Sequence, residues 1–355
     1  MRHGIQFPYD PEISHEKMRI GIFLVLGLLL VCFFCLDIFL GSVSIKPSMV
    51  FRALFGDADS NVQMIITKFR IPKAITAMLV GIALSLSGLQ MQTLFRNPMA
   101  GPYVLGVSSG AGLGVALVVL GFSTGLGADN FRSFGNWILV ISAWIGAGAV
   151  TVLIMFISSR VRDIMTVLII GIMLASGISA IISILQYFSN ETMLKTYVLW
   201  TMGSLGNLSA GQLNVLIISV LTGILLSIIS IKMLNAFLVG ESYARSIGLN
   251  IKLSRAVIFS CTSILAGSVT AFCGPIGFIG IAVPHIARNL FKTSDHRILV
   301  PGTVVIGAAV MLASDIVSQL PGSETILPVN SITSLIGIPV VIWVILRNKK
   351  DQSIF

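Results

Sequence analysis

Long apolar stretches separated by short polar segments account for nearly the whole chain. Nine of these stretches are long enough to cross the roughly 30 Å hydrocarbon core of a bilayer as helices. They begin near Ile20, Ala74, Val104, Trp137, Ile164, Leu213, Ala256, Leu299 and Ile326. Together with a tenth, interrupted segment from Ile276 to Leu290, they predict an all-helical integral membrane protein of about ten spans, with residues 1–355 in a single transmembrane domain.

The interrupted segment is apolar, yet the run from Gly274 to Arg288 contains three glycines and two prolines. Each proline removes a backbone donor and clashes with the preceding turn. Non-helical backbone persists at membrane depth only where protein or a water-filled cavity shields it, and short broken helices often line transport pathways. We therefore expect a broken, short helix near Gly274–Leu290 beside such a pathway.

The composition supports the membrane assignment. Hydrophobic residues make up 55% of the chain and charged residues 10%, and the mean hydropathy is +0.97, which excludes the soluble globular class. The first apolar run, Ile20 to Leu40, is too long for the core of a signal peptide and lacks a small-residue cleavage site. We expect it to be retained as a helix.

The positive charges are distributed unevenly between the two sides of the predicted bundle. An even number of spans places both termini on one side, and sixteen of the 23 Lys and Arg residues fall in the loops of that side. Because positively charged short loops stay in the cytoplasm, both termini are predicted to be cytoplasmic. This asymmetry accounts for the net charge of +9 without any nucleic-acid partner.

No catalytic motif is present. The sequence has no Walker A pattern, no Gly-Lys dipeptide and no cluster of histidines and carboxylates at metal-ligand spacing. The chain is therefore not expected to be an enzyme or to bind a metal or cofactor. Any ATP and Mg²⁺ that drive it would be used by a separate polypeptide.

One polar segment interrupts this apolar chain, from Gly240 to Gly248. Glu241 at its start and Arg245 four residues later suit the dipole of a short helix and an i,i+4 ion pair, and Gly248 suits the helix end. The pattern is equally typical of a docking helix for a partner and of a stabilised loop helix.

Three stretches resemble a known family of permeases. Ser87 to Gly110 includes an Asn-Pro-Met-Ala turn followed by Leu-Gly-Val-Ser, similar to the family's Asn-Pro-Leu-Ala turn and the helix start after it. Gly274 to Arg297 and Leu327 to Pro339 also resemble it, the latter with Asn330 where a glycine is usual. The family is the FecCD family of ATP-binding-cassette (ABC) importer permeases, which carry iron-siderophores, haem and vitamin B12, and the chain resembles its vitamin B12 permeases.

The resemblance implies a type II ABC importer permease fold in the bacterial plasma (inner) membrane. Two like subunits would form a homodimer within the lipid, driven by two cytoplasmic ATPase subunits. An external, periplasmic binding protein would deliver a metal chelate or corrinoid, which would cross by alternating access. The sequence does not identify which of these substrates is carried.

The resemblance also assigns roles to residues. The segment Gly240 to Gly248 is similar to the coupling helix that fits into the ATPase subunit, matching at Gly240, Glu241, Ala244, Arg245 and Gly248. Near the external side, Arg70 and Lys73 resemble cations that pair with glutamates of the binding protein, with Lys73 in place of an arginine. Gln319 stands where the family has a third arginine. Anchoring of Arg70 and Lys73 to lipid headgroups is the alternative.

A cytoplasmic gate is implied at the Asn-Pro-Met turn and at the start of the fifth helix. The corresponding residues are Asn97, Met99, Ile164 and Met165. Ordinary hydrophobic packing is the alternative for all four.

An ion-coupled secondary transporter would also have many spans and broken helices. Such a protein is expected to place ionisable residues within the membrane for its coupling ion. Only Asp37 and Asp315 approach that position, and both lie toward segment ends. A membrane-embedded enzyme would need clustered His, Asp or Glu near the interface.

Overall fold

Helices make up all the regular structure that is described in this computed structural model, which covers residues 11–352 except 42, 44, 57, 58, 122–136, 207 and 321–325. Seven long apolar helices or helix runs can cross a bilayer: α1 (Pro11–Phe39), the run that ends with α4 (Ile71–Leu94), α7 (Trp137–Arg160), α8 (Ile164–Tyr187), α10 (Ala210–Val239), α12 (Ile251–Cys273) and α14 (His296–Ser318). The other apolar segments are α5 (Val107–Ala116) with the π-helical turn η2 (Leu117–Gly121), α13 (Ile279–Phe291) and α15 (Val329–Gln352). These ten segments confirm the predicted all-helical membrane architecture.

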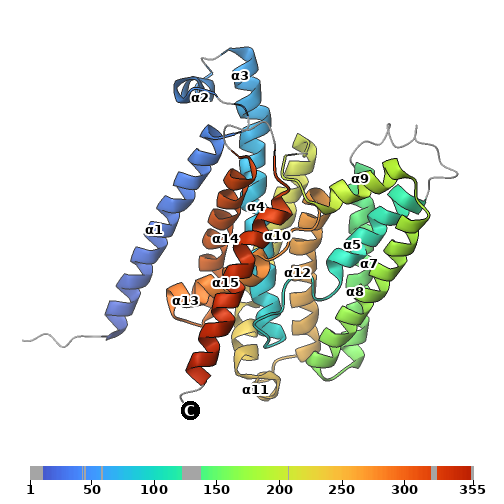
Figure 1. Ribbon diagram of the computed structural model, residues 1–355. Coiled ribbons are helices and arrows are strands. Elements are labelled where there is room, and N and C mark those ends of the chain that lie inside the picture. Colours follow the sequence, from blue (N-terminus) through green and yellow to red (C-terminus); the bar gives the residue numbers. More distant parts are fainter. Residues whose placement is uncertain are drawn as a thin grey trace, which may run out of the picture.

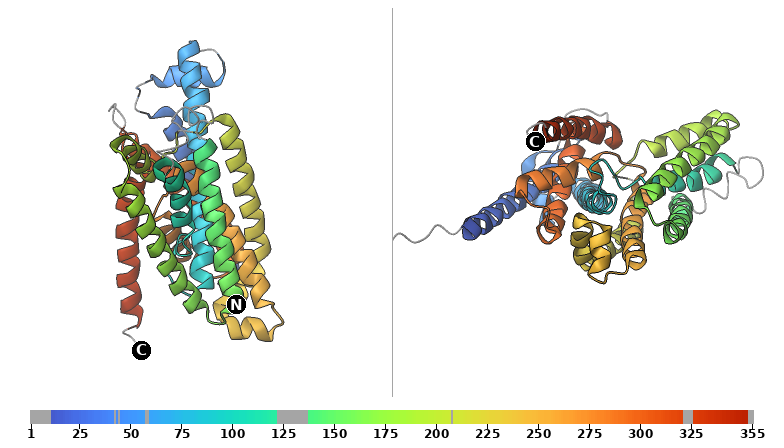
Figure 2. Two further views of the ribbon diagram at one scale, coloured as in Figure 1. Left: turned by 90° about the vertical axis from the view of Figure 1, so that its right-hand side faces the viewer. Right: turned by 90° about the horizontal axis from the view of Figure 1, so that it is seen from below.

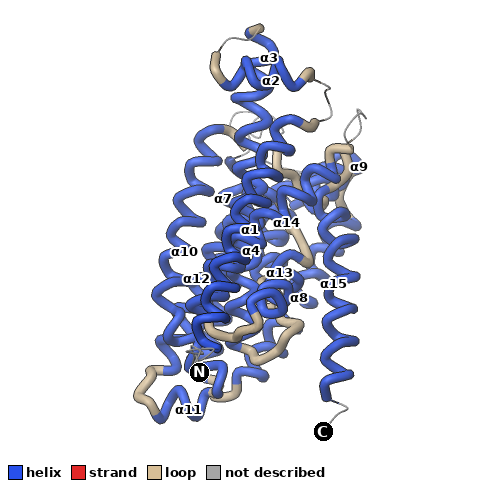
Figure 3. Tube along the Cα trace, turned by 90° about the vertical axis from the view of Figure 1, so that its left-hand side faces the viewer, coloured by secondary structure: helices blue, strands red, loops and turns tan. Residues whose placement is uncertain are grey.

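The helices run between two ends of an elongated bundle (Figures 1 and 3). Three short helices lie outside the spans, α2 (Pro47–Leu54), α9 (Glu191–Thr201) and α11 (Glu241–Ser246), while α3 (Ser60–Met64) begins the second span. One end of the bundle carries α2 and α3, and the opposite end carries α11. The start of α1 and the end of α15 lie at the α11 end, as an even number of crossings requires. Seen along the bundle, α1 lies at one edge and α7 to α9 at the other (Figure 2).

The second span is longer than predicted. Helical structure begins at Ser60, well before Ala74, and continues through the π-helical turn η1 (Ile65–Arg70) into α4. The wider π turn lies directly before Pro72, which has no N–H and whose ring needs room beside the preceding turn. The second span therefore begins well before the predicted start near Ala74, and Pro72 is accommodated inside a continuous helix of 35 residues.

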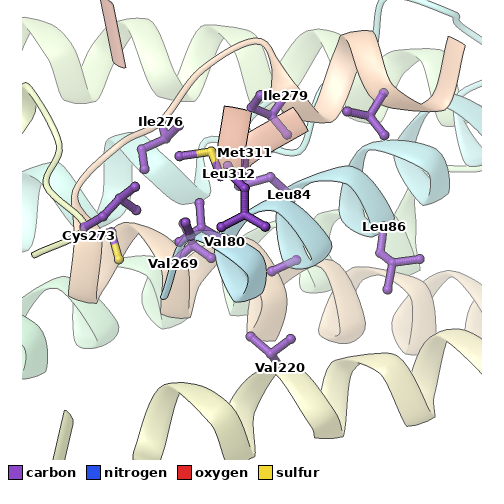
Figure 4. Close-up of a cluster of buried hydrophobic side chains, with 14 of the residues drawn as sticks. Val80, Leu84, Leu86, Val220, Val269, Cys273, Ile276, Ile279, Met311 and Leu312 are labelled. Carbon is purple, nitrogen blue, oxygen red and sulfur yellow. The ribbon is translucent and has the colours of Figure 1, made fainter. Parts of the chain in front are cut away.

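At the centre of the bundle, α4 packs against α10, α12, α13 and α14. Its apolar side chains, such as Val80 and Leu84, share a buried cluster with Val269 of α12 and Met311 of α14 (Figure 4). A Cβ added at Gly81 would overlap the backbone of Gly307. The two helices thus approach closely through small residues, the usual means of tight helix association in membranes.

Glycines of α5 also allow close packing of helices. A Cβ at Gly110 would lie 2.5 Å from the backbone oxygen of Gly146, and one at Gly114 would overlap the backbone of Ser142. Both contacts join α5 to α7. The glycines therefore allow the close packing of α5 and α7.

The interrupted segment forms a loop followed by the short helix α13, as predicted. Gly274 (φ +77°) ends α12, and Phe278 (φ +65°) precedes α13, which contains Pro284. Protein groups satisfy this irregular backbone: Asn330 Oδ1 accepts a hydrogen bond from Gly277 N at 2.9 Å, and the Cys273 carbonyl accepts one from Ser204 N at 2.8 Å. Asn330, which departs from the family pattern, therefore joins the start of α15 to the loop.

Candidate functional site

The predicted coupling segment forms the isolated short helix α11 at one tip of the bundle. Gly240 (φ +136°) separates it from α10, and Gly248 (φ +85°) ends it, with Gly248 N and Leu249 N donating to the carbonyls of Arg245 and Ala244. Left-handed φ angles favour glycine at both places. Ala244 is fully buried against the bundle, so the helix is held by one face.

The carboxylate of Glu241 forms two ion pairs. The predicted partner, Arg245, lies 3.6 Å away on the same helix, with its side chain largely exposed. A closer partner is Arg255 of α12, at 2.7 Å. Sequence reasoning missed Arg255, because no local spacing connects two residues on different helices.

Arg255 is only 3% exposed and binds more than Glu241. Its guanidinium also donates to the carbonyl oxygens of Val161, at 3.1 Å, and Arg162, at 2.7 Å. These two carbonyls lie in the turn between α7 and α8. Arg255 therefore connects the coupling helix to the start of α8 through a continuous set of hydrogen bonds.

The turn at the end of α4 lies near α11, because a Cβ at Gly240 would lie 3.4 Å from the Arg96 guanidinium. Asn97 Oδ1 accepts a hydrogen bond from Met99 N at 2.9 Å, which fixes the turn. The Pro98 carbonyl accepts one from His285 Nε2 of α13 at 2.8 Å. Met99 is 39% exposed, so its side chain is available at the surface of this end. His285 therefore has a structural role, joining α13 to this turn.

Ile164 and Met165 begin α8 at the same end of the bundle. Asp163 caps this helix, accepting from Thr166 N at 2.9 Å, from the Thr166 hydroxyl at 2.8 Å and from Met165 N at 3.2 Å. The Thr166 hydroxyl and these N–H groups hold the pKa of Asp163 below its usual range. Met165 is 39% exposed and Ile164 is half-buried. The four gate candidates thus share one end of the molecule, on two separate turns.

Arg70 lies at the opposite end, where α1 stops. Arg70 is 8% exposed, and its guanidinium donates to the carbonyl oxygens of Ile38, at 2.8 Å, Phe39, at 3.0 Å, and Val43, at 2.5 Å. The Arg70 side chain is therefore turned toward the end of α1 and away from the surface, and its docking role stays a prediction. The carbonyls at the end of α1 lack helical partners, and Arg70 supplies their donors.

Lys73 also points inward, with its side chain 19% exposed. Its ammonium group lies 2.9 Å from Asp315 Oδ1. Gln319 Nε2 donates to Asp315 Oδ2 at 3.0 Å and to Asp37 Oδ1 at 2.7 Å. We call this group, Asp37, Lys73, Asp315 and Gln319, the outer polar cluster. It joins α1, α4 and α14 and, apart from Asp37, lines a cavity of about 410 Å³.

The outer polar cluster was not predicted, since its members come from three distant segments. Asp37 and Asp315 were placed only near segment ends, yet both are almost fully buried, and Gln319 bridges them. Gln319 is itself 6% exposed, so the residue at the family's third arginine position faces its own helices. Within the described residues, no group of three or more His, Cys, Asp or Glu side chains could hold a metal ion.

Comparison with known proteins gives the chain its family. Residues 28–347 match the model of the FecCD transport family. The vitamin B12 import system permease protein BtuC of Klebsiella pneumoniae is 36% identical over 288 residues, which cover 81% of this chain and 84% of that protein. The hemin transport system permease protein HmuU of Yersinia pestis is 33% identical over 334 residues, covering 93% and 97%.

A solved structure agrees with the sequence comparison. It is described as an inward-facing conformation of a metal-chelate type ABC transporter, and its chain is 28% identical. The two chains superpose with a TM-score of 0.80 over 92% of this chain and 99% of that one. This chain therefore belongs to the FecCD transport family and is the membrane-spanning permease of an ABC importer, in which a separate subunit hydrolyses ATP.

Proposed function

We propose that two copies of this chain surround a central path and import a metal chelate or corrinoid, delivered by an external binding protein. Two cytoplasmic ATPase subunits would bind at α11 and tilt the helices of the permease. The bundle would then switch between two packed arrangements, one open to each side of the membrane. Relatives named for vitamin B12 and hemin import, and a neighbour named for metal chelates, support this substrate class. The permease itself performs no covalent chemistry.

The observation that carries the proposal is the connection from α11 to α8. Motion of α11 pulls on Glu241, which is paired with Arg255 at 2.7 Å. Arg255 in turn holds the carbonyls of Val161 and Arg162, three and two residues before α8 begins at Ile164. A push on the coupling helix thus reaches the helix that carries two of the four gate candidates. The outward surface of α11 includes Tyr243, 48% exposed, and Arg245, which could contact the ATPase.

The test is the double substitution Glu241→Ala with Arg245→Ala in the complete transporter, reconstituted in liposomes. Both ion pairs of α11 are then lost, while Ala244 still anchors the helix. We expect uptake and substrate-stimulated ATP hydrolysis to fall about tenfold, a coupling loss of about 1.4 kcal/mol. Basal ATP hydrolysis and the amount of permease in the membrane are expected to stay unchanged.

The matched control is Glu16→Ala with Arg297→Ala, which removes one acid and one base from exposed positions at the same end of the bundle. This variant is expected to transport as the wild type does. Normal uptake and normal stimulation in the α11 variant would refute the coupling assignment.

The substrate is decided by a separate measurement. The binding protein that associates with the reconstituted transporter is isolated, and its bound ligand is identified by absorption and mass spectrometry. We expect a corrinoid, haem or ferric siderophore. Uptake driven by an ion gradient without ATP would contradict the proposed importer and support the ion-coupled alternative.

A further inference from the structure

A cavity of about 420 Å³ lies beside the coupling helix, between the end of α7 and the start of α12. We call it the basic cavity. Its lining contains a single carboxylate, Glu241, and five cationic side chains: Arg160, Arg162, Arg245, Lys252 and Arg255. Such a concentration of positive charge favours a negatively charged occupant.

The carboxylates near the basic cavity are already engaged. Glu241 pairs with Arg245 and Arg255. Asp163, next to Arg162 in the sequence, accepts hydrogen bonds from the first turn of α8. In the described part of the chain, no carboxylate forms an ion pair with Arg160, Arg162 or Lys252. Three exposed cations therefore border the cavity without a protein counter-charge.

Two buried polar atoms of the lining residues also lack partners. Ser158 Oγ and Arg255 Nε have no hydrogen-bond partner, although Ser158 is 4% exposed and Arg255 is 3% exposed. A buried donor without a partner costs about 1–3 kcal/mol, and more when it is charged. Both residues line the cavity, so an occupant with acceptor oxygens that reached these two donors would satisfy them.

The surroundings of the basic cavity are those of a membrane boundary. Arg160 is the last residue of α7 and lies over the ring of Phe156, 5.4 Å from its centroid. Phe156 is 59% exposed, and Ile169 on the adjacent α8 is 56% exposed. Apolar surface for acyl chains therefore lies within two turns of the cations. The sequence places this end of the bundle on the cytoplasmic side, where the leaflet carries anionic lipids.

We propose that the basic cavity binds a phosphate group, supplied by the headgroup of an anionic phospholipid of the cytoplasmic leaflet. Arg162 and Lys252 provide charge-assisted hydrogen bonds at the opening, and Arg160 positions the headgroup above the apolar face of α7. The bound lipid joins α7, α8 and α12 at the turn that Arg255 holds. Lipid binding here stabilises the permease on its own, independently of the ATPase subunits.

The experiment uses the full-length permease, without ATPase subunits, in a neutral detergent. Its melting temperature is measured with added phosphatidylglycerol, with phosphatidylcholine as the neutral lipid, and with inorganic phosphate at the same concentration. We expect phosphatidylglycerol to raise the melting temperature of the wild type by about 3 °C and phosphatidylcholine to have no comparable effect.

The test variant is Arg162→Gln with Lys252→Gln. Both side chains are exposed, and the Arg162 carbonyl that Arg255 binds is retained. The control variant, Lys17→Gln with Arg297→Gln, removes the same charge from exposed positions at the same end, outside the basic cavity. We expect the phosphatidylglycerol effect to be lost in the test variant and kept in the control.

The remaining outcomes of this experiment distinguish a bound lipid from free phosphate and from a protein partner. An equal rise with inorganic phosphate would support the phosphate site and identify free phosphate as its source. Equal stabilisation of both variants by phosphatidylglycerol would overturn the proposal. So would a test variant that keeps the lipid effect but binds the ATPase subunit more weakly, since the basic cavity would then be a protein-docking surface.

Discussion

Single polar side chains hold distant segments of this protein together. Gln90, in the last two turns of α4, donates to Ser227 Oγ of α10 at 2.8 Å and accepts from Thr262 Oγ1 of α12 at 3.0 Å. Arg70 likewise donates to three carbonyls at and just after the end of α1. Within a bilayer such groups have no water to replace a lost partner, so each should contribute measurably to stability.

The substitution Gln90→Leu keeps a similar volume and removes three hydrogen bonds between helices, including the one that Gln90 Nε2 donates to Cys261 Sγ at 3.1 Å. We expect the free energy of unfolding to fall by about 0.5–2 kcal/mol, because Ser227 and Thr262 are buried and lose a partner. The measurement is the unfolding midpoint in mixed micelles of increasing SDS content. Ser176→Ala, at an exposed position of α8, is the control and should leave the midpoint unchanged.

Arg70→Gln tests the structural role of a residue that the sequence had assigned to binding-protein docking. Three carbonyls near the end of α1 would lose charge-assisted donors, and we expect a loss of about 1–3 kcal/mol in stability. Lys68→Gln, on the exposed side of the preceding turn, is the control. If Arg70→Gln left stability unchanged but slowed binding-protein association at low salt, the docking assignment would be favoured instead.

At the scale of helices, close approach through glycine sets the position of α4. A Cβ at Gly88 would overlap the backbone of Gly280 in α13, the short helix after the interrupted segment. The two backbones are therefore in direct contact. The helix α13 cannot easily move away from α4, because the loop before it and His285 within it are hydrogen-bonded to other segments.

We expect Gly88→Ala to destabilise the protein by about 1–3 kcal/mol or more, because the added methyl group forces α4 and α13 apart. Gly148→Ala in α7 has open space around its Cβ and should be neutral or slightly stabilising. Melting temperatures of the two variants in detergent provide the comparison. Similar temperatures for both would show that α13 adjusts freely.

At the scale of the whole molecule, the functional surfaces lie at two ends. The end with α11 carries the coupling helix, the basic cavity and the four gate candidates. The opposite end carries the outer polar cluster. Communication between the ends must pass through helices such as α4, which reaches from Arg70 to the turn at Asn97.

The gate assignment predicts a cross-link that depends on nucleotide. Met99→Cys is preferable to Asn97→Cys, because Asn97 holds its turn by accepting from Met99 N. In a cysteine-free background, we expect Met99→Cys to cross-link to its symmetry mate in one nucleotide state of the transporter and not in the other. Ile169→Cys, exposed farther along α8, is the control. Equal cross-linking with and without ATP would mean that Met99 keeps the same position in both states and is not part of a gate.

The sequence by itself determined the features that depend on length, hydropathy and short-range geometry. Apolar length fixes the spans, because backbone groups in lipid must be satisfied within a helix. The two glycines around α11 and the broken segment before α13 follow from local φ angles and from prolines. The family motifs lie in these same segments and identified the class of protein.

Tertiary structure alone decided where the polar side chains point. Asp37 and Gln319 are 282 residues apart in the sequence, and Arg255 and Arg162 are 93 apart, yet both pairs are hydrogen-bonded. No local pattern encodes such contacts, since they depend on which helices pack together. A cation in an apolar chain can face lipid, water, a partner or a buried carbonyl with the same sequence. For Arg70 and Lys73, the packing of α1 and α14 against α4 determines that the side chains face buried carbonyls and a carboxylate.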